Sequence, residues 1–240
     1  MKHSIKGFIP TSFVDWPGKI SSVIFLAGCG FRCPACHNYK LVTDPDSLDD
    51  YPLDEILRQL ERRKHWIDGV TVTGGEPTIR SNLPELLSLL RECGARVKLD
   101  TNGARPAMLA RLIESGLVDA VYMDVKAPLD ARHYSRAAGV PVDPAVIRRS
   151  IRILNSADVE VAFRTTVVPG LVEEPELRLI VRALGPAHRF IVQPFRGAET
   201  LSPHLREAKE FSLDRFEAMK TTFEIPAASS VPPKRLAGVG

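Results

Sequence analysis

Three of the four cysteines in this 240-residue sequence lie within eight residues of one another. Cys29, Cys33 and Cys36 follow the spacing C-x3-C-x2-C on a loop that also contains glycine and proline. Cysteine thiolates bind zinc and iron–sulfur clusters, whereas three clustered cysteines make a poor disulfide framework for a chain of this length. The spacing therefore predicts a metal site in a reducing compartment.

The number of thiolates indicates the kind of metal site. A structural zinc site usually has four Cys or His ligands, and a [4Fe-4S] cluster usually has four thiolates. With three thiolates, one iron of a cluster keeps a coordination position open for a small-molecule ligand. Three alternatives remain: zinc with His37 as its fourth ligand, haem attached at the C-x-x-C-H sequence that ends at His37, and cysteines that only fill a core.

Polar residues also end the apolar, β-rich runs that follow the cysteines. Gly74, Gly75 and Glu76 come after the run 69–73, where paired glycines allow close backbone approach and the carboxylate can accept a hydrogen bond from an ammonium group. Later runs carry further polar residues, namely Asp100 and Asn102, then Asp124 and Lys126, then Arg164. Each set alone is compatible with turn chemistry, but barrel folds gather their active sites at such strand ends.

The sequence as a whole alternates between β-rich runs and segments of helical period. We expect strands at 22–28, 69–73, 96–100, 120–126, 160–168 and 189–194, and helices at 53–64, 83–93, 106–115, 144–155, 175–184 and 213–222. The strands are nearly continuous in apolar or β-branched residues, as in a parallel sheet covered by helices. Six βα steps are too few for a closed eight-stranded barrel, so the sequence predicts an α/β fold, a partial (β/α)6 TIM-like barrel open on one side.

Composition bounds the organisation and the partners of the chain. Residues 1–225 are expected to form one domain with a β-like N-terminal lead, and 226–240 a disordered tail. Lys and Arg are spread along a chain whose net charge is only +3, which argues against a nucleic-acid partner. No apolar stretch approaches the roughly 18 residues of a membrane span, and no apolar signal sequence opens the chain. We therefore expect a cytoplasmic protein with no membrane contact.

The cysteine spacing, with the Gly-Gly-Glu motif at 74–76 one strand later, resembles the radical S-adenosylmethionine (SAM) superfamily. The resemblance implies a [4Fe-4S] cluster whose open iron is chelated by the amino and carboxylate groups of SAM. Reduction of the cluster then cleaves SAM to a 5′-deoxyadenosyl radical, and no catalytic side chain is implied beyond the cluster and SAM. The aromatic residue that usually precedes the third cysteine is replaced by Ala35, which leaves adenine packing to His37 or Tyr39.

The segment 5–19, IKGFIPTSFVDWPGK, resembles the T-S-x-x-D-x-P-G-K lead of the proteins that activate anaerobic ribonucleoside-triphosphate reductase. The segments CHN, TGGEPT, MDVKAP and RTTVVPGL extend this similarity to glycyl-radical activating enzymes of the pyruvate formate-lyase-activating type. Taken without the resemblance, Pro17 and Gly18 form an ordinary turn between two β-like runs.

The resemblance to the activating enzymes also implies roles for individual residues. Asp100, Asn102 and Lys126 would contact the ribose or carboxylate of SAM, and Arg164 would pair with the carboxylate. Several relatives carry a histidine that touches SAM where this chain has Gln193. Some relatives hold a monovalent cation at the positions that match Asp100, Thr101, Tyr122 and Asp124.

The function implied by the resemblance is that of a radical SAM oxidoreductase. The 5′-deoxyadenosyl radical would abstract hydrogen from a glycine of a partner glycyl-radical enzyme, with anaerobic ribonucleoside-triphosphate reductase as the favoured partner. A flavodoxin or ferredoxin-type electron donor is also implied. The alternatives are a radical SAM enzyme that acts on a small molecule and a non-catalytic iron–sulfur electron-transfer or sensor protein.

Overall fold

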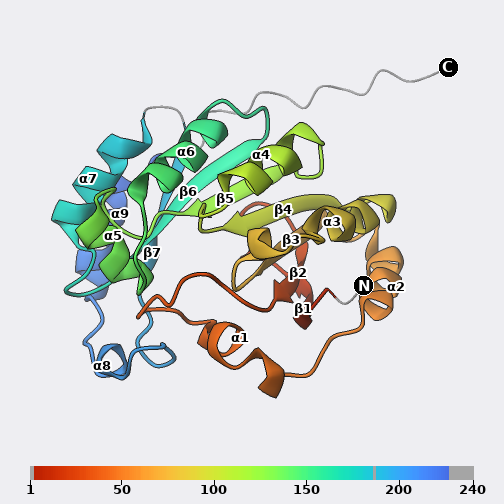
Figure 1. Ribbon diagram of the computed structural model, residues 1–240, viewed down its shortest axis with the longest axis horizontal. Helices are drawn as coiled ribbons and strands as arrows, with labels where there is room; N and C mark the ends of the chain where they lie inside the picture. The colour runs from red at the N-terminus through yellow and green to blue at the C-terminus, as the bar shows by residue number, and fades with distance from the viewer. Residues whose placement is uncertain (1–2, 186–187, 227–240) are drawn as a thin grey trace.

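The computed structural model describes residues 3–185 and 188–226, whose strands form one seven-stranded sheet (Figure 1). The strands lie side by side in sequence order: β1 (Ile5–Ser12), β2 (Ser21–Leu26), β3 (Gly69–Gly74), β4 (Arg96–Thr101), β5 (Ala120–Asp124), β6 (Glu160–Val167) and β7 (Arg189–Pro194). β1 pairs antiparallel with β2, and every later pair is parallel. Within the described ranges β1 and β7 are the two edges of an open sheet, which confirms the predicted partial barrel.

The six predicted helices are all present, with ends that differ by at most one residue from the prediction. They are α2 (Leu53–Arg63), α3 (Leu83–Glu92), α4 (Pro106–Glu114), α6 (Pro144–Asn155), α7 (Glu174–Leu184) and α9 (Leu213–Phe223). Figure 1 shows α3, α4 and α6 over one face of the sheet. The leucines of α3 show why: Leu83, Leu86, Leu87 and Leu90 recur at helical period and are all buried.

Three short helices and two 3-10 turns were not predicted. They are α1 (Tyr39–Thr43), α5 (Ala131–Ala138), α8 (Pro203–Arg206), η1 (Pro45–Ser47) and η2 (Pro77–Ile79). The sequence of α5, ARHYSRAA, buries only Tyr134 and Ala138, so its apolar period is weak. Its two ends carry stronger signals, because Asp130 caps the backbone amide of His133 and Gly139 follows with a positive φ of 69°.

The β-like lead is an edge strand, β1, followed by a segment that closes the amino end of the barrel. Trp16 in this segment is fully buried and packs with Ala120, Tyr122 and Ala162, which point inward from β5 and β6. The indole Nε1 of Trp16 donates a hydrogen bond to Glu160 Oε1 at 3.3 Å. We call Trp16, Ala120, Tyr122 and Ala162 the floor.

No helix in the part of the chain that the structure describes has the length and apolar character needed to cross a membrane. Of the predicted tail 226–240, only Pro226 lies within the described residues. The expected domain boundary at residue 225 therefore stays a prediction.

Candidate active site

A cavity of about 300 Å³ lies at the carboxyl ends of the parallel strands. Its walls come from the loop after β2 and from the ends of β3, β4, β5 and β6. The cavity brings together all eleven site residues expected from the sequence, namely Cys29, Cys33, Cys36, Gly74, Gly75, Glu76, Asp100, Asn102, Asp124, Lys126 and Arg164. Residues that are far apart in the chain thus share one site.

The cysteine loop, residues 29–36, is held by hydrogen bonds from distant segments. The Arg32 amide donates to the Ala138 carbonyl at the end of α5 (2.8 Å), and the Ser202 amide donates to the Pro34 carbonyl (2.9 Å). The loop also packs tightly against Gly139, since a Cβ there would lie 2.0 Å from the Arg32 carbonyl oxygen. The unpredicted helix α5 and the segment before α8 therefore fix the position of the loop.

Burial raises the pKa of all three loop thiols, and that of Cys33 to about 11. The positive charge of Lys126 opposes this shift at each sulfur. Within the described residues, no three Cys, His, Asp or Glu side chains converge closely enough to hold a single metal ion. Three thiols around one cavity suit a polynuclear cluster, because each thiolate of such a cluster binds its own iron.

The Gly-Gly-Glu motif lies beside the cysteine loop and is hydrogen-bonded to the segment that leads into it. The Gly75 amide donates to the Leu26 carbonyl and the Glu76 amide to the Gly28 carbonyl, both at 2.8 Å. A Cβ on Gly75 would lie only 2.1 Å from the Gly28 carbonyl oxygen. Glycine at position 75 therefore allows the backbone of the motif to lie against the backbone that leads into the cysteine loop.

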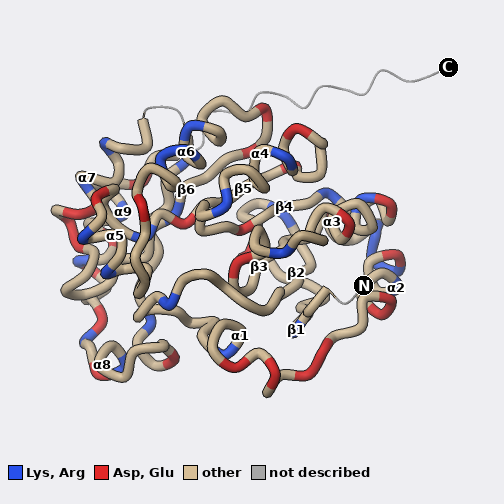
Figure 2. The backbone as a smooth tube through the Cα atoms, in the orientation of Figure 1, with Lys and Arg blue, Asp and Glu red and all other residues tan. Residues whose placement is uncertain are grey.

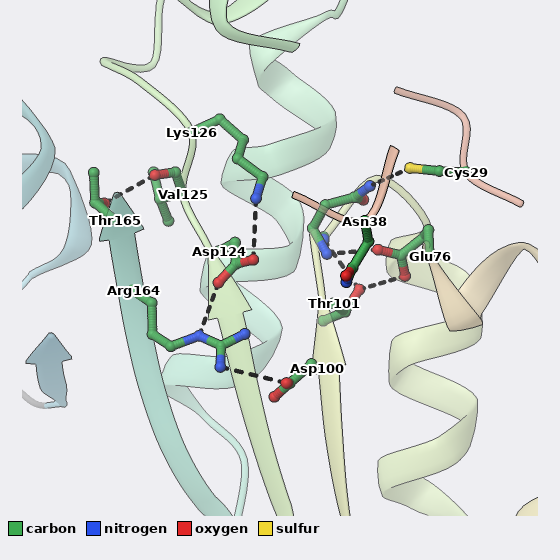
Figure 3. Close-up of polar contacts among 12 residues, drawn as sticks. Cys29, Asn38, Glu76, Asp100, Thr101, Asp124, Val125, Lys126, Arg164 and Thr165 are labelled. Atoms are coloured by element: carbon green, nitrogen blue, oxygen red, sulfur yellow. Dashed lines mark hydrogen bonds and ion pairs between the residues drawn. The ribbon is translucent and has the colours of Figure 1, made fainter. Parts of the chain in front are cut away.

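Glu76 joins the ends of β3 and β4 (Figure 3). Its carboxylate accepts hydrogen bonds from the Thr101 hydroxyl at 2.7 Å and the Asn102 amide at 2.6 Å, and further bonds from the amide and hydroxyl of Thr78. The side chain of Asn102 points toward the cysteine loop, with its Nδ2 3.6 Å from Cys29 Sγ. Burial raises the pKa of Glu76, and these four donors lower it.

Opposite Glu76, charged side chains of β4, β5 and β6 form a connected series (Figure 3). Arg164 Nε lies 2.8 Å from Asp124 Oδ1, and an Arg164 terminal nitrogen lies 3.4 Å from Asp100 Oδ2. Lys126 Nζ lies 3.0 Å from the other Asp124 oxygen. Burial alone would raise the pKa of Asp124, but Arg164 and Lys126 outweigh it and hold the pKa at about 2. Asp124 is thus an anion shared by two cations.

Two site residues were missed by the sequence analysis. Asn38 lines the cavity and donates from Nδ2 to the Gly74 carbonyl at 3.0 Å, which links the cysteine loop to the Gly-Gly-Glu motif. Its signal was present in the CHN segment. Lys98 lies below the cavity and pairs with Asp100. The sequence did not indicate a role for Lys98, because a lysine in a predicted strand is expected to be exposed to solvent.

Of the two residues expected to pack the adenine, His37 lines the cavity and Tyr39 does not. Ala35, at the position of the usual aromatic residue, and Gln193, at the position of the relatives' histidine, also line it. The His37 ring nitrogen Nε2 lies 2.8 Å from the Arg196 carbonyl oxygen. Tyr39 is not among the lining residues, and its ring packs instead under the Arg206 guanidinium, 5.5 Å away.

The four positions expected to share a monovalent cation are not gathered at one point. The Thr101 hydroxyl donates to Glu76, and the Tyr122 hydroxyl donates to Glu160 Oε1 at 2.8 Å. Arg164 contacts the two carboxylates, Asp100 and Asp124. The cation therefore stays a prediction, and this geometry adds no support to it.

Comparison with known proteins gives the class of this site. The model of the Radical SAM superfamily matches residues 23–180. The fold is similar to that of a radical SAM methyltransferase from Sphaerobacter thermophilus, with a TM-score of 0.63 and 14% identity over 89% of this chain and 65% of that chain. The protein belongs to the radical SAM superfamily, whose enzymes use a [4Fe-4S] cluster and SAM.

Proteins with higher sequence identity to this chain are named as activating enzymes. A Methanocaldococcus jannaschii protein assigned as a glycyl-radical enzyme activating enzyme is 31% identical over 81% of each chain. The pyruvate formate-lyase-activating enzyme of Clostridium pasteurianum is 29% identical, over 72% of this chain and 71% of that protein. The chain is therefore a radical SAM enzyme of the activase type. This result favours an iron–sulfur cluster over zinc, haem or core-filling cysteines, and an enzyme over a non-catalytic protein.

Proposed function

We propose that Cys29, Cys33 and Cys36 hold the [4Fe-4S] cluster and that the enzyme generates a glycyl radical on a partner protein. A cluster held there would supply the one electron that breaks the bond between the SAM sulfur and C5′, which gives methionine and the 5′-deoxyadenosyl radical. The radical takes a hydrogen atom from a partner glycine and leaves as 5′-deoxyadenosine. The observation that carries this proposal is the meeting of all eleven expected residues in one cavity.

The charges of the cavity support a place for SAM. Arg164 and Lys126 are cations at its wall and suit the SAM carboxylate, while Glu76 and Asp100 offer oxygen acceptors to the ammonium and ribose groups. Asn102, held by Glu76, lies beside Cys29 and thus between the cluster thiols and this polar wall.

The size of the cavity favours a protein substrate over a small molecule. Pockets that hold one drug-sized ligand have volumes of about 300–1,000 Å³, and this cavity of about 300 Å³ would be shared by the cluster and SAM. A second pocket, lined by Thr11, Glu55, Gln59, Arg62, Arg63 and Trp66, shares no residue with this cavity and so offers no compartment beside SAM. A glycine on a flexible loop of a partner protein needs no such compartment, because it is delivered from outside.

The particular partner we propose is anaerobic ribonucleoside-triphosphate reductase, on the similarity of the segment 5–19. We also propose a flavodoxin or ferredoxin-type reductant, a cytoplasmic location and action as a single domain without nucleic acid. Figure 2 supports the absence of a nucleic-acid footprint, since Lys and Arg are interleaved with Asp and Glu along the chain.

The test uses protein reconstituted anaerobically with iron and sulfide and reduced with dithionite. With SAM it should release 5′-deoxyadenosine, and with added anaerobic ribonucleoside-triphosphate reductase it should produce a glycyl-radical doublet in the electron paramagnetic resonance spectrum. Cluster-loaded protein that releases no 5′-deoxyadenosine would contradict SAM cleavage. Cleavage without a doublet on this reductase, but with one on another glycyl-radical enzyme, would contradict only the choice of partner.

A further inference from the structure

Lys98 is a buried cation to which the site as described so far gives no role. It lies in β4 two residues before Asp100, so both side chains point to the same face of the sheet. The side chain of Lys98 has no exposed surface, and its Nζ makes a hydrogen bond to Asp100 Oδ1. Its Nζ also lies 4.4 Å from the centroid of the Tyr122 ring, at the floor.

Lys98 is the lower end of a series of alternating charges that rises from the floor to the cavity. We define the charge ladder as Lys98, Asp100, Arg164, Asp124 and Lys126, in the order of their contacts. Each carboxylate of the ladder lies between two cations. Three cations against two carboxylates leave one positive charge in excess, next to the place proposed for the SAM carboxylate.

Lys98 and Arg164 contact different oxygens of the Asp100 carboxylate, and this arrangement indicates the role of Lys98. Lys98 contacts Oδ1 of Asp100 and Arg164 contacts Oδ2. Because Lys98 takes one oxygen, Arg164 is shared between Asp100, at 3.4 Å, and Asp124, at 2.8 Å. Without Lys98, Asp100 would be a buried carboxylate with one cation, and Arg164 is the cation able to turn toward it.

Other charges around Lys98 do not replace this contact. Burial lowers the pKa of Lys98, Asp100 raises it, and Arg164 lowers it. Asp15, on the segment that carries the floor tryptophan, adds a further negative charge that raises the pKa of Lys98. Neither Asp15 nor Tyr122 replaces Lys98 at Asp100, because Asp15 is itself an anion and the Tyr122 hydroxyl donates to Glu160.

We propose that Lys98 is a positioning residue for SAM: by holding one oxygen of Asp100, it keeps Arg164 between the two carboxylates and at the cavity wall. This inference rests on the proposed function, because it assumes that SAM occupies the cavity. The expected consequence is a change in SAM affinity rather than in the rate of bond cleavage once SAM is bound.

The test compares Lys98→Met with wild type in protein reconstituted with iron and sulfide. Equilibrium dialysis of SAM against the oxidised cluster protein measures the dissociation constant without turnover, and release of 5′-deoxyadenosine under dithionite measures the rate at saturating SAM. We expect the dissociation constant for SAM to rise about tenfold. This rise corresponds to the loss of about one charge-assisted hydrogen bond between Arg164 and the SAM carboxylate. Lys64→Met, which removes an exposed lysine paired with Glu61, is the matched control and should bind SAM as wild type does.

A double-mutant comparison separates positioning from a general loss of stability. If Lys98 acts through Asp100, then Lys98→Met adds nothing to the SAM dissociation constant of Asp100→Asn. The double variant removes both charges together, so it keeps the comparison available if Lys98→Met alone does not fold. Effects that multiply in the double variant, or wild-type SAM affinity in Lys98→Met, would overturn the inference. Failure of wild-type holoenzyme to cleave bound SAM would overturn the proposed function instead.

Discussion

The two ends of the partial barrel are built from the same strands in opposite ways. At the amino end, Trp16 and Tyr122 fill the interior and are at most 1% exposed. Toward the carboxyl end, β4, β5 and β6 carry Asp100, Asp124 and Arg164, which line a cavity. The floor combines apolar packing with hydrogen bonds from Trp16 and Tyr122 to Glu160, whereas the cavity end is held by hydrogen bonds and ion pairs between distant segments. The difference teaches that stability and chemistry are carried by different residues of one sheet, as is general for barrel enzymes.

The largest effect is expected from removing one thiol at the cavity end of the barrel. Cys33→Ala should lower the release of 5′-deoxyadenosine by more than about a thousandfold, because the proposed cluster would lose a ligand while the floor is untouched. The control is Cys93→Ala, since Cys93 ends α3 and does not line the cavity. The measurement is 5′-deoxyadenosine per chain by chromatography. Equal activity in Cys33→Ala and wild type would contradict the assignment.

A substitution at the floor should lower the stability of the protein and leave cluster loading of the folded protein intact. Trp16→Ala removes a fully buried indole and should lower the free energy of unfolding by about 3–5 kcal/mol, with the remaining folded protein still able to load a cluster. Trp66→Ala removes an indole that is 75% exposed and should change it by no more than about 0.5 kcal/mol. Urea unfolding followed by circular dichroism gives both values. Similar losses in the two variants would show that Trp16 does not close the barrel.

The smallest effect is expected from a substitution that tests the contact between α5 and the cysteine loop. Gly139→Ala and Gly116→Ala both place a methyl group at a positive φ, 69° and 63°, and the backbone strain alone should cost about 1–2 kcal/mol of stability in each. At Gly139 the methyl group also meets the Arg32 carbonyl, whereas nothing lies within 4 Å of it at Gly116. Iron content after reconstitution should therefore fall only in Gly139→Ala. Equal iron in both variants would mean that α5 does not position the loop.

The sequence was most informative where periodicity and motif coincide. Strands such as 69–73 end in polar residues, and parallel pairing must bring such ends together, so the lining of the cavity could be predicted. Lys98 could not, because its place two residues before Asp100 becomes informative only once Asp100 is known to point inward from β4. α5 escaped for a different reason: its sequence buries two residues, and its position depends on contact with a loop that is about a hundred residues earlier.

The anchoring of the cysteine loop has a consequence for how the enzyme is made. The three cysteines leave the ribosome early, while the residues that hold their loop, Ala138 and Ser202, are translated only later. A nascent chain therefore carries three thiols without a fixed arrangement for most of its synthesis. We expect cluster insertion to follow completion of the fold, and a chain released before Ser202 to bind iron poorly even though it contains all three cysteines of the loop.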